Sequence, residues 1–192
     1  MAPSPMHIGL SAWIIQDGNY DDFACGELRR FALEFYPARG LRAASGEAPG
    51  LVHLDNAMYS AGGRVCHAGP DAWVVDFGGV MAFRDEAAPS WAREGALVAG
   101  DVYLGIDPFF YFERLYKLPG VPPLIYEWRI EAIDMDSTPF VDSIDEKGRA
   151  VKVRDESRKG RVPIPATDGW KDDREYVLHC TMTQSVPMRT RE

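Results

Sequence analysis

The chain has 192 residues, of which 46% are hydrophobic and 26% charged. This is the composition of a folded globular protein and excludes a disordered one, and the length suits one well-packed domain. The formal net charge of −8 opposes binding to nucleic acid or anionic membranes. We therefore expect a basic protein or a cationic ligand to be favoured as a partner, although the same charge also serves plain solubility.

The chain carries no sign of a membrane or secretory protein. No apolar run approaches the ~20 residues that a membrane-spanning helix needs, so we expect no membrane partner. The start, MAPSP, lacks the cationic region and apolar block of a secretory signal. Cys25, Cys66 and Cys180 are odd in number and widely spaced, which favours reduced thiols and a cytoplasmic location.

The first elements are predicted strands. Residues 7–16, HIGLSAWIIQ, predict a strand that ends at the turn signal Asp17-Gly18. Residues 27–36 fit two structures: Phe31, Leu33 and Phe35 alternate as in a strand, while the apolar spacing from residue 28 to residue 35 also fits a helix. The aromatic content and the neighbouring strands favour the strand.

Further strands follow along the chain. Residues 72–83 predict a hairpin, because the Gly78-Gly79 pair suits the positive φ angles of a two-residue turn. Residues 100–107, 124–136 and 175–182 also alternate as strands do. Within 124–136 the alternation changes phase after Ala132, which predicts a bulge or a strand end. The one other helical candidate is residues 88–97, with Ser90 as its cap and Gly95 at its end.

These elements predict an all-β, mainly antiparallel fold, either a sandwich or a small closed barrel, with at most one or two short helices. We expect a single β-rich domain over residues 1–192. The alternative is two small β subdomains divided near residues 84–95, where polar sequence interrupts the strands. Residues 145–174 are polar and are predicted to form a mobile loop.

Two patterns suggest a metal site at first sight. Asp17, Asn19 and Asp21 alternate as in a calcium loop, but the sixth position is Asp22 where glycine is needed, and the twelfth is Leu28 where glutamate is needed. We therefore predict a plain turn.

The second pattern is the two adjacent pairs Cys66-His67 and His179-Cys180. They lack the short spacing of zinc knuckles, and adjacent side chains in a strand point to opposite faces. The carboxylates of Asp134 and Asp136 are interpreted as a solvated strand end rather than a cation site. We expect no specific metal and no cofactor. The sequence also has none of the common nucleophile or phosphate-loop motifs, so it indicates no catalytic residues.

An aromatic-rich stretch runs from residue 105 to residue 128. Consecutive aromatic residues in a strand cannot all face one core. Those on the second face are either covered by another element of the fold or offered to a partner. The candidate binding face consists of Phe109, Phe110, Tyr111, Phe112, Tyr116 and Tyr126.

A basic segment lies at residues 147–161, where seven basic residues face two acidic ones, so the rest of the chain carries −13. Such a segment is either a solvated loop or a patch for an anionic ligand, for phosphate or for an acidic face of another copy. The candidate anion-facing residues are Arg154, Arg158, Lys159 and Arg161.

Three classes of function follow from these features. The favoured one is a non-catalytic β-domain that binds a protein partner, another copy of itself or a small apolar ligand through the aromatic face. The second is a small barrel that binds single-stranded nucleic acid by stacking bases on aromatic rings beside the basic loop; the overall acidity counts against it. The third is an enzyme whose catalytic residues converge only in three dimensions.

Overall fold

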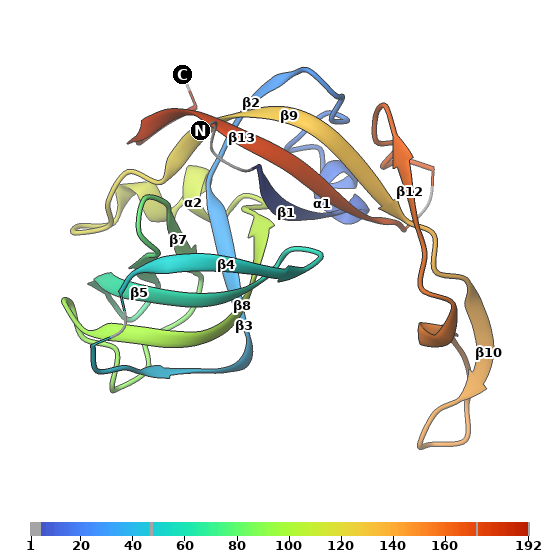
Figure 1. The fold of residues 1–192 in the computed structure, drawn as a ribbon, viewed down its shortest axis with the longest axis horizontal. Helices are drawn as coiled ribbons and strands as arrows, with labels where there is room; N and C mark the ends of the chain where they lie inside the picture. Colours follow the sequence, from blue (N-terminus) through green and yellow to red (C-terminus); the bar gives the residue numbers. More distant parts are fainter. Residues whose placement is uncertain (1–4, 47, 172, 192) are drawn as a thin grey trace.

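The computed structural model describes residues 5–46, 48–171 and 173–191. Strands make up 53% of the chain and helices 8%, and the centre is a closed five-stranded β-barrel of mixed strand direction with further strands attached. The all-β prediction is confirmed, and of the two predicted architectures the protein forms the barrel. Figure 1 shows the barrel strands beneath a second, curved sheet, with a hairpin projecting to one side.

The barrel closes because one strand pairs on both of its edges. β8 (Leu97–Ile106) pairs antiparallel with β3 (Leu33–Ala43) on one side and with β5 (Met58–Ala68) on the other. β6 (Trp73–Asp76) and β7 (Met81–Arg84) complete the ring between β5 and β3. The β3–β7 pairing is parallel, and the other pairings of the ring are antiparallel. β4 (Gly50–Asp55) is added outside the ring, on β5.

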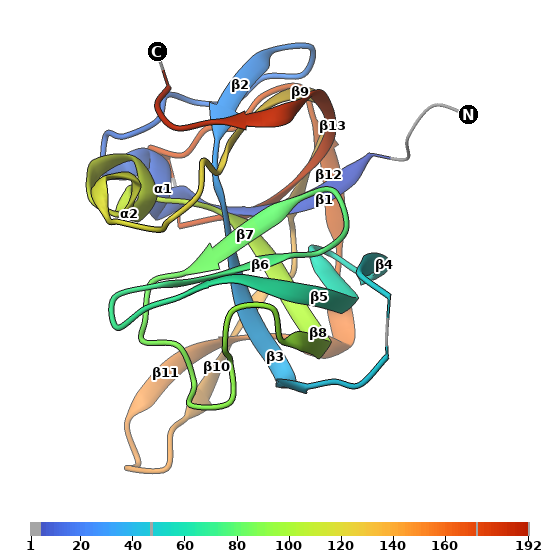
Figure 2. The same cartoon turned by 90° about the vertical axis from the view of Figure 1, so that its left-hand side faces the viewer.

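The second sheet continues from the barrel at β8. β1 (Met6–Ser11) lies parallel to β8 and pairs along its length with β13 (Glu175–Met188), which pairs in turn with β9 (Ile125–Asp136). The far edge of β9 is shared by β2 (Leu28–Phe31) and β12 (Arg161–Ile164). In Figure 2 this sheet lies above the barrel.

One extended segment joins the two sheets and confirms the predicted strand over residues 27–36. The segment pairs with β9 as β2, passes Ala32, and then pairs with β8 as β3. At the switch, the ring of Phe31 stacks on Trp128 with 5.6 Å between the ring centroids and 15° between the planes. The indole N–H of Trp128 donates to the Phe31 carbonyl at 3.3 Å. Aromatic packing therefore fixes the point where the chain changes sheet.

Two local predictions of strand geometry are also confirmed. Gly78 and Gly79 have φ angles of +87° and +122° and form the turn between β6 and β7. The side chain of Asp76 accepts hydrogen bonds from both glycine N–H groups, at 2.8 and 3.2 Å. In β9 the pairing register shifts at Glu131, between the partners of Ala132 and Ile130, so a bulge lies where the alternation changes phase.

The N-terminal strand is shorter than predicted. It ends at Ser11, and residues Ala12–Gln16 form the short helix α1. The side chains of Ile14 and Ile15 are both buried. In a strand these adjacent side chains would point to opposite faces, whereas one helical turn directs both into the core. Residues 88–97 form turns and no helix, so that helical prediction is wrong.

The aromatic stretch forms helical turns instead of the expected strand. α2 (Phe110–Glu113) is followed by the 3-10 helix η1 (Leu115–Lys117). The buried carboxylate of Asp107 accepts hydrogen bonds from the N–H groups of Phe109 and Tyr111, which ends β8 and starts the turn. Burial raises the pKa of Asp107 to about 7.

The projecting hairpin is the part of the fold least covered by the rest. β10 (Phe140–Ile144) and β11 (Ala150–Arg154) form a two-stranded sheet of their own, which we call the arm. The 3-10 helix η2 (Glu156–Arg158) then leads to β12. Residues 145–174 therefore contain two strands, and their mobility stays a prediction. Residues 84–95 lie between β7 and β8, so a domain boundary there would divide one barrel.

Replacing Trp128 by alanine should lower the free energy of unfolding by about 3–5 kcal/mol, because its side chain is fully buried where the two sheets meet. Urea denaturation measures the loss. The matched control is Val52→Ala in β4, whose side chain is 66% exposed and should cost no more than about 0.5 kcal/mol. Equal losses in the two variants would contradict this description of the core.

Candidate functional site

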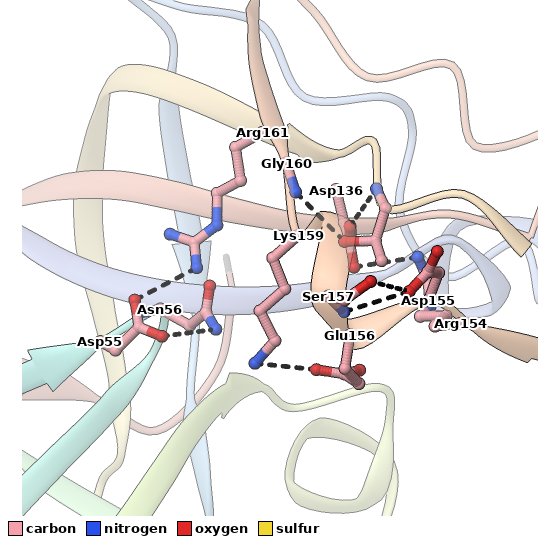
Figure 3. Close-up of polar contacts among 11 residues, drawn as sticks. Asp55, Asn56, Asp136, Arg154, Asp155, Glu156, Ser157, Lys159, Gly160 and Arg161 are labelled. Atoms are coloured by element: carbon pink, nitrogen blue, oxygen red, sulfur yellow. Dashed lines mark hydrogen bonds and ion pairs between the residues drawn. The ribbon is translucent and has the colours of Figure 1, made fainter.

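The basic segment is the first candidate site. Each of the four predicted anion-facing side chains lies against a carboxylate. The pairs of Arg154 and Arg161 join the segment to other parts of the fold (Figure 3). The pairs are Arg154–Asp136 at 2.9 Å, Arg158–Asp155 at 2.5 Å, Lys159–Glu156 at 2.9 Å and Arg161–Asp55 at 3.4 Å. The local positive charge that the sequence shows is thus largely compensated in the folded chain.

A pocket of about 420 Å³ lies beside these pairs, between the β4–β5 turn and the start of β12. Three acidic and two basic side chains line it, together with Asn56, Thr138 and Gly160. Figure 3 shows Asp55 bonded to Asn56 and Arg161, and Glu156 bonded to Lys159. Since exposed ion pairs of this kind contribute little and carry little net field, the pocket has no electrostatic preference for an anion.

The six residues of the predicted aromatic face are not gathered on one open surface. Tyr111 and Tyr126 are buried, and their hydroxyl groups bond inside the protein. The hydroxyl of Tyr111 donates to the Pro122 carbonyl at 2.9 Å, and that of Tyr126 accepts from the N–H of Met81 at 3.0 Å. These two tyrosines therefore belong to the core.

The remaining residues of that face, Phe109, Phe110, Phe112 and Tyr116, are half-buried. The guanidinium carbon of Arg191 lies 3.5 Å from the centroid of the Phe112 ring, so the Arg191 side chain covers part of that ring. Helical turns direct successive side chains around an axis, so these residues spread over several directions. The aromatic face is therefore smaller than the sequence suggests.

A cluster of histidines is the feature that sequence reasoning missed. His7 on β1, His53 on β4 and His179 on β13 come together, with ring centroids 4.0 Å apart for His7–His53 and 4.2 Å for His7–His179. Nε2 of His179 lies 2.9 Å from Oδ2 of Asp134 on β9. The four residues are spread over the whole chain, so no spacing in the sequence signals them. Only the packing of the second sheet against β4 unites them.

The electrostatics of the cluster disfavour full protonation. Burial of the imidazole lowers the pKa of His7, and the neighbouring His179 and His53 lower it further. Asp134 and the Asn56 carbonyl raise the pKa of His7. An imidazole held by a carboxylate can serve as a general base. Among the described residues, no hydroxyl or thiol is hydrogen-bonded to the His179 ring, whose partner is the Asp134 carboxylate.

Among the residues that the structure describes, no group of three or more His, Cys, Asp or Glu side chains is arranged to hold a metal ion. Asp17 and Asn19 bond to each other at 2.6 Å in a surface turn. In residues 5–46, 48–171 and 173–191 no helix has the length and hydropathy needed to cross a membrane.

The arm exposes three large apolar side chains. Phe140, Ile144 and Val153 are 54%, 74% and 42% exposed. Each of its two strands also has one edge without a pairing strand. A hairpin with apolar side chains and open edges can be stabilised by a further strand or by an apolar surface of another molecule.

Comparison with known proteins gives no lead to the site. No protein-family model matches this chain, and neither curated proteins nor solved structures contain a significant match to it.

The histidine cluster predicts a pH dependence of stability. The pKa of His7 is lower in the folded chain than its unfolded value of about 6.5. The unfolded state therefore takes up this proton first, so the contribution is present above pH ~6.5 and is lost as the pH falls. Wild-type protein should lose more unfolding free energy between pH 7.5 and pH 5 than His7→Gln loses, as measured by urea denaturation.

Val52→Ala is the control for that comparison, because Val52 lies beside His53 on β4 and has no titratable group. This variant should lose the same unfolding free energy between pH 7.5 and pH 5 as the wild type does. If His7→Gln and the wild type lose the same free energy, the cluster does not resist protonation.

Proposed function

We propose that this chain is a non-catalytic β-barrel domain that binds a protein partner, that the arm makes the contact, and that the partner is a second copy of the same chain. The observation that carries the proposal is the projecting hairpin of Figure 1, with exposed Phe140, Ile144 and Val153. Aromatic and aliphatic anchors of this kind supply much of the binding energy at protein interfaces.

The structure of the arm supports the proposal that it binds another molecule. A two-stranded hairpin alone is marginally stable in water, and among the described residues no third strand pairs with this one. Apolar side chains lie on both of its faces, with Phe140 and Ile144 on one and Val153 on the other. A partner strand added at either edge would satisfy the free backbone groups and cover part of the apolar surface.

Charge favours a second copy as the occupant. Residues 140–154, which form the arm, contain four basic and three acidic side chains, a net charge of +1, so the rest of the chain carries −9. The arm of one copy is therefore attracted to the body of another, and the complementarity is reciprocal across a two-fold axis. The half-buried Phe109, Phe110, Phe112 and Tyr116 remain a second, smaller contact surface under this proposal.

The proposal predicts self-association that depends on the arm. Sedimentation velocity of the wild type should show a concentration-dependent dimer, and Phe140→Ser combined with Ile144→Ser should shift the chain to monomer without loss of fold. Both side chains are exposed, so their replacement should cost the monomer little stability. Val186→Ser is the matched control, since Val186 is a strand residue 69% exposed outside the arm.

Two outcomes would contradict this proposal. One is a wild-type chain that stays monomeric at every concentration tested. The other is a dimer that persists in the Phe140→Ser, Ile144→Ser variant but dissociates in Val186→Ser. That result would place the interface at the end of β13 instead of the arm.

The same proposal predicts that single-stranded DNA and RNA do not bind at ~0.15 M salt. The net charge is −8, and the four candidate phosphate-binding side chains already have carboxylate partners. Fluorescence anisotropy with labelled oligonucleotides tests this. Sub-micromolar binding that weakens steeply with salt would favour the nucleic-acid alternative, because each neutralised phosphate releases counterions.

A further inference from the structure

A second pocket lies where the barrel meets the second sheet. It has a volume of about 320 Å³ and is lined by the aromatic side chains of Trp13 on α1, Tyr36 on β3 and Tyr103 on β8. Trp13 is 45% exposed, although α1 buries its other large apolar side chains. Core packing alone does not explain why aromatic rings from three different elements surround one opening.

Glycines form the floor of this pocket. Gly9 and Gly105 face each other at the one point where β1 pairs with β8. A Cβ atom on Gly9 would lie 1.7 Å from the hydroxyl oxygen of Tyr103, so only glycine allows that ring to lie on the strand. A Cβ atom on Gly105 would lie 3.5 Å from the nearest ring atom of Tyr103 and 3.6 Å from that of Tyr36. The tyrosine rings are thereby held in place at the pocket.

The charge at the pocket is negative. Glu175 is the charged residue among those that line it, and its carboxylate accepts a hydrogen bond from the Ser11 hydroxyl at 2.7 Å. The nearest arginines that influence Glu175 and Tyr103 are Arg154 and Arg161. Both are already ion-paired, with Asp136 and Asp55 respectively. Arg84, which lies against the Tyr36 ring, is also ion-paired, with Glu34 at 3.1 Å. A cation entering the pocket therefore meets the Glu175 carboxylate, while these three arginines are held by other carboxylates.

The ring of Tyr36 is prepared to attract positive charge. Its hydroxyl donates to the buried carboxylate of Glu34 at 2.6 Å, which increases the electron density of the ring. The guanidinium carbon of Arg84 lies 4.6 Å from the centroid of this ring, so the ring already takes part in one cation–π contact. Tyr36 still lines the pocket, in a T-shaped arrangement with Tyr103 at 6.1 Å.

We propose that this pocket binds a small organic cation of the quaternary or tertiary ammonium class. Its methyl groups contact the rings of Trp13, Tyr36 and Tyr103, and its charge faces Glu175. Aromatic cages recognise such cations because the faces of the rings are electronegative and the methyl groups remain apolar. The net charge of −8 adds a field of the right sign. This site is separate from the arm and does not depend on self-association.

Isothermal titration calorimetry with choline tests the proposal, with 3,3-dimethyl-1-butanol as the uncharged analogue of equal shape. Choline should bind saturably and the alcohol should not. Trp13→Ala should weaken choline binding by about tenfold, and Glu175→Gln should weaken it while keeping the Ser11 bond. Trp170→Ala is the control, since Trp170 is 65% exposed and does not line the pocket; it should bind choline as the wild type does.

A trimethyllysine peptide and the same peptide with unmodified lysine distinguish the source of the cation. Tighter binding of the methylated peptide than of choline would assign the site to a modified protein, and the reverse would assign it to a free metabolite; both support the proposal. Three results would overturn it: no saturable choline binding, equal binding of choline and the neutral alcohol, or wild-type affinity in Trp13→Ala.

Discussion

Strand β8 is the element on which the rest of the structure depends. It pairs with β3 on one edge and β5 on the other, and this double pairing closes the barrel. It also meets β1 at the Gly9–Gly105 pair, through which the second sheet is attached. A closed ring has no open edge in its centre, so the sheet edges of the described chain lie at its periphery, on β2, β4, β12 and the arm.

The attachment of the second sheet explains where the unusual side-chain clusters lie. The histidine cluster forms where β1, β9 and β13 pass β4, and the aromatic pocket forms where β1 and α1 pass β3 and β8. Both lie between barrel and sheet, where side chains from distant parts of the sequence face each other. Pockets at such junctions are common binding sites, because two layers provide walls that one layer alone cannot form.

The charges of the chain are organised by the same geometry. In the sequence, the basic segment and the acidic remainder are separate, which suggests a patch for anions. In the fold, Asp55 from the β4–β5 turn and Asp136 from the end of β9 reach Arg161 and Arg154. The ion pairs anchor the base of the arm to the body, while its apolar side chains Phe140, Ile144 and Val153 stay exposed. Opposite charges that are far apart in the sequence are thus paired at short range in the folded chain.

The sequence by itself determined part of the local structure. Alternation of side chains, the Gly78-Gly79 turn and the phase change after Ala132 predicted strands, a hairpin and a bulge that the structure confirms, because these features depend on neighbouring residues only. The barrel closure, the meeting of His7, His53 and His179, and the burial of Tyr111 and Tyr126 were decided by tertiary structure alone. Each of these depends on which strands lie side by side, and strand order follows from the packing of the whole chain rather than from any short segment.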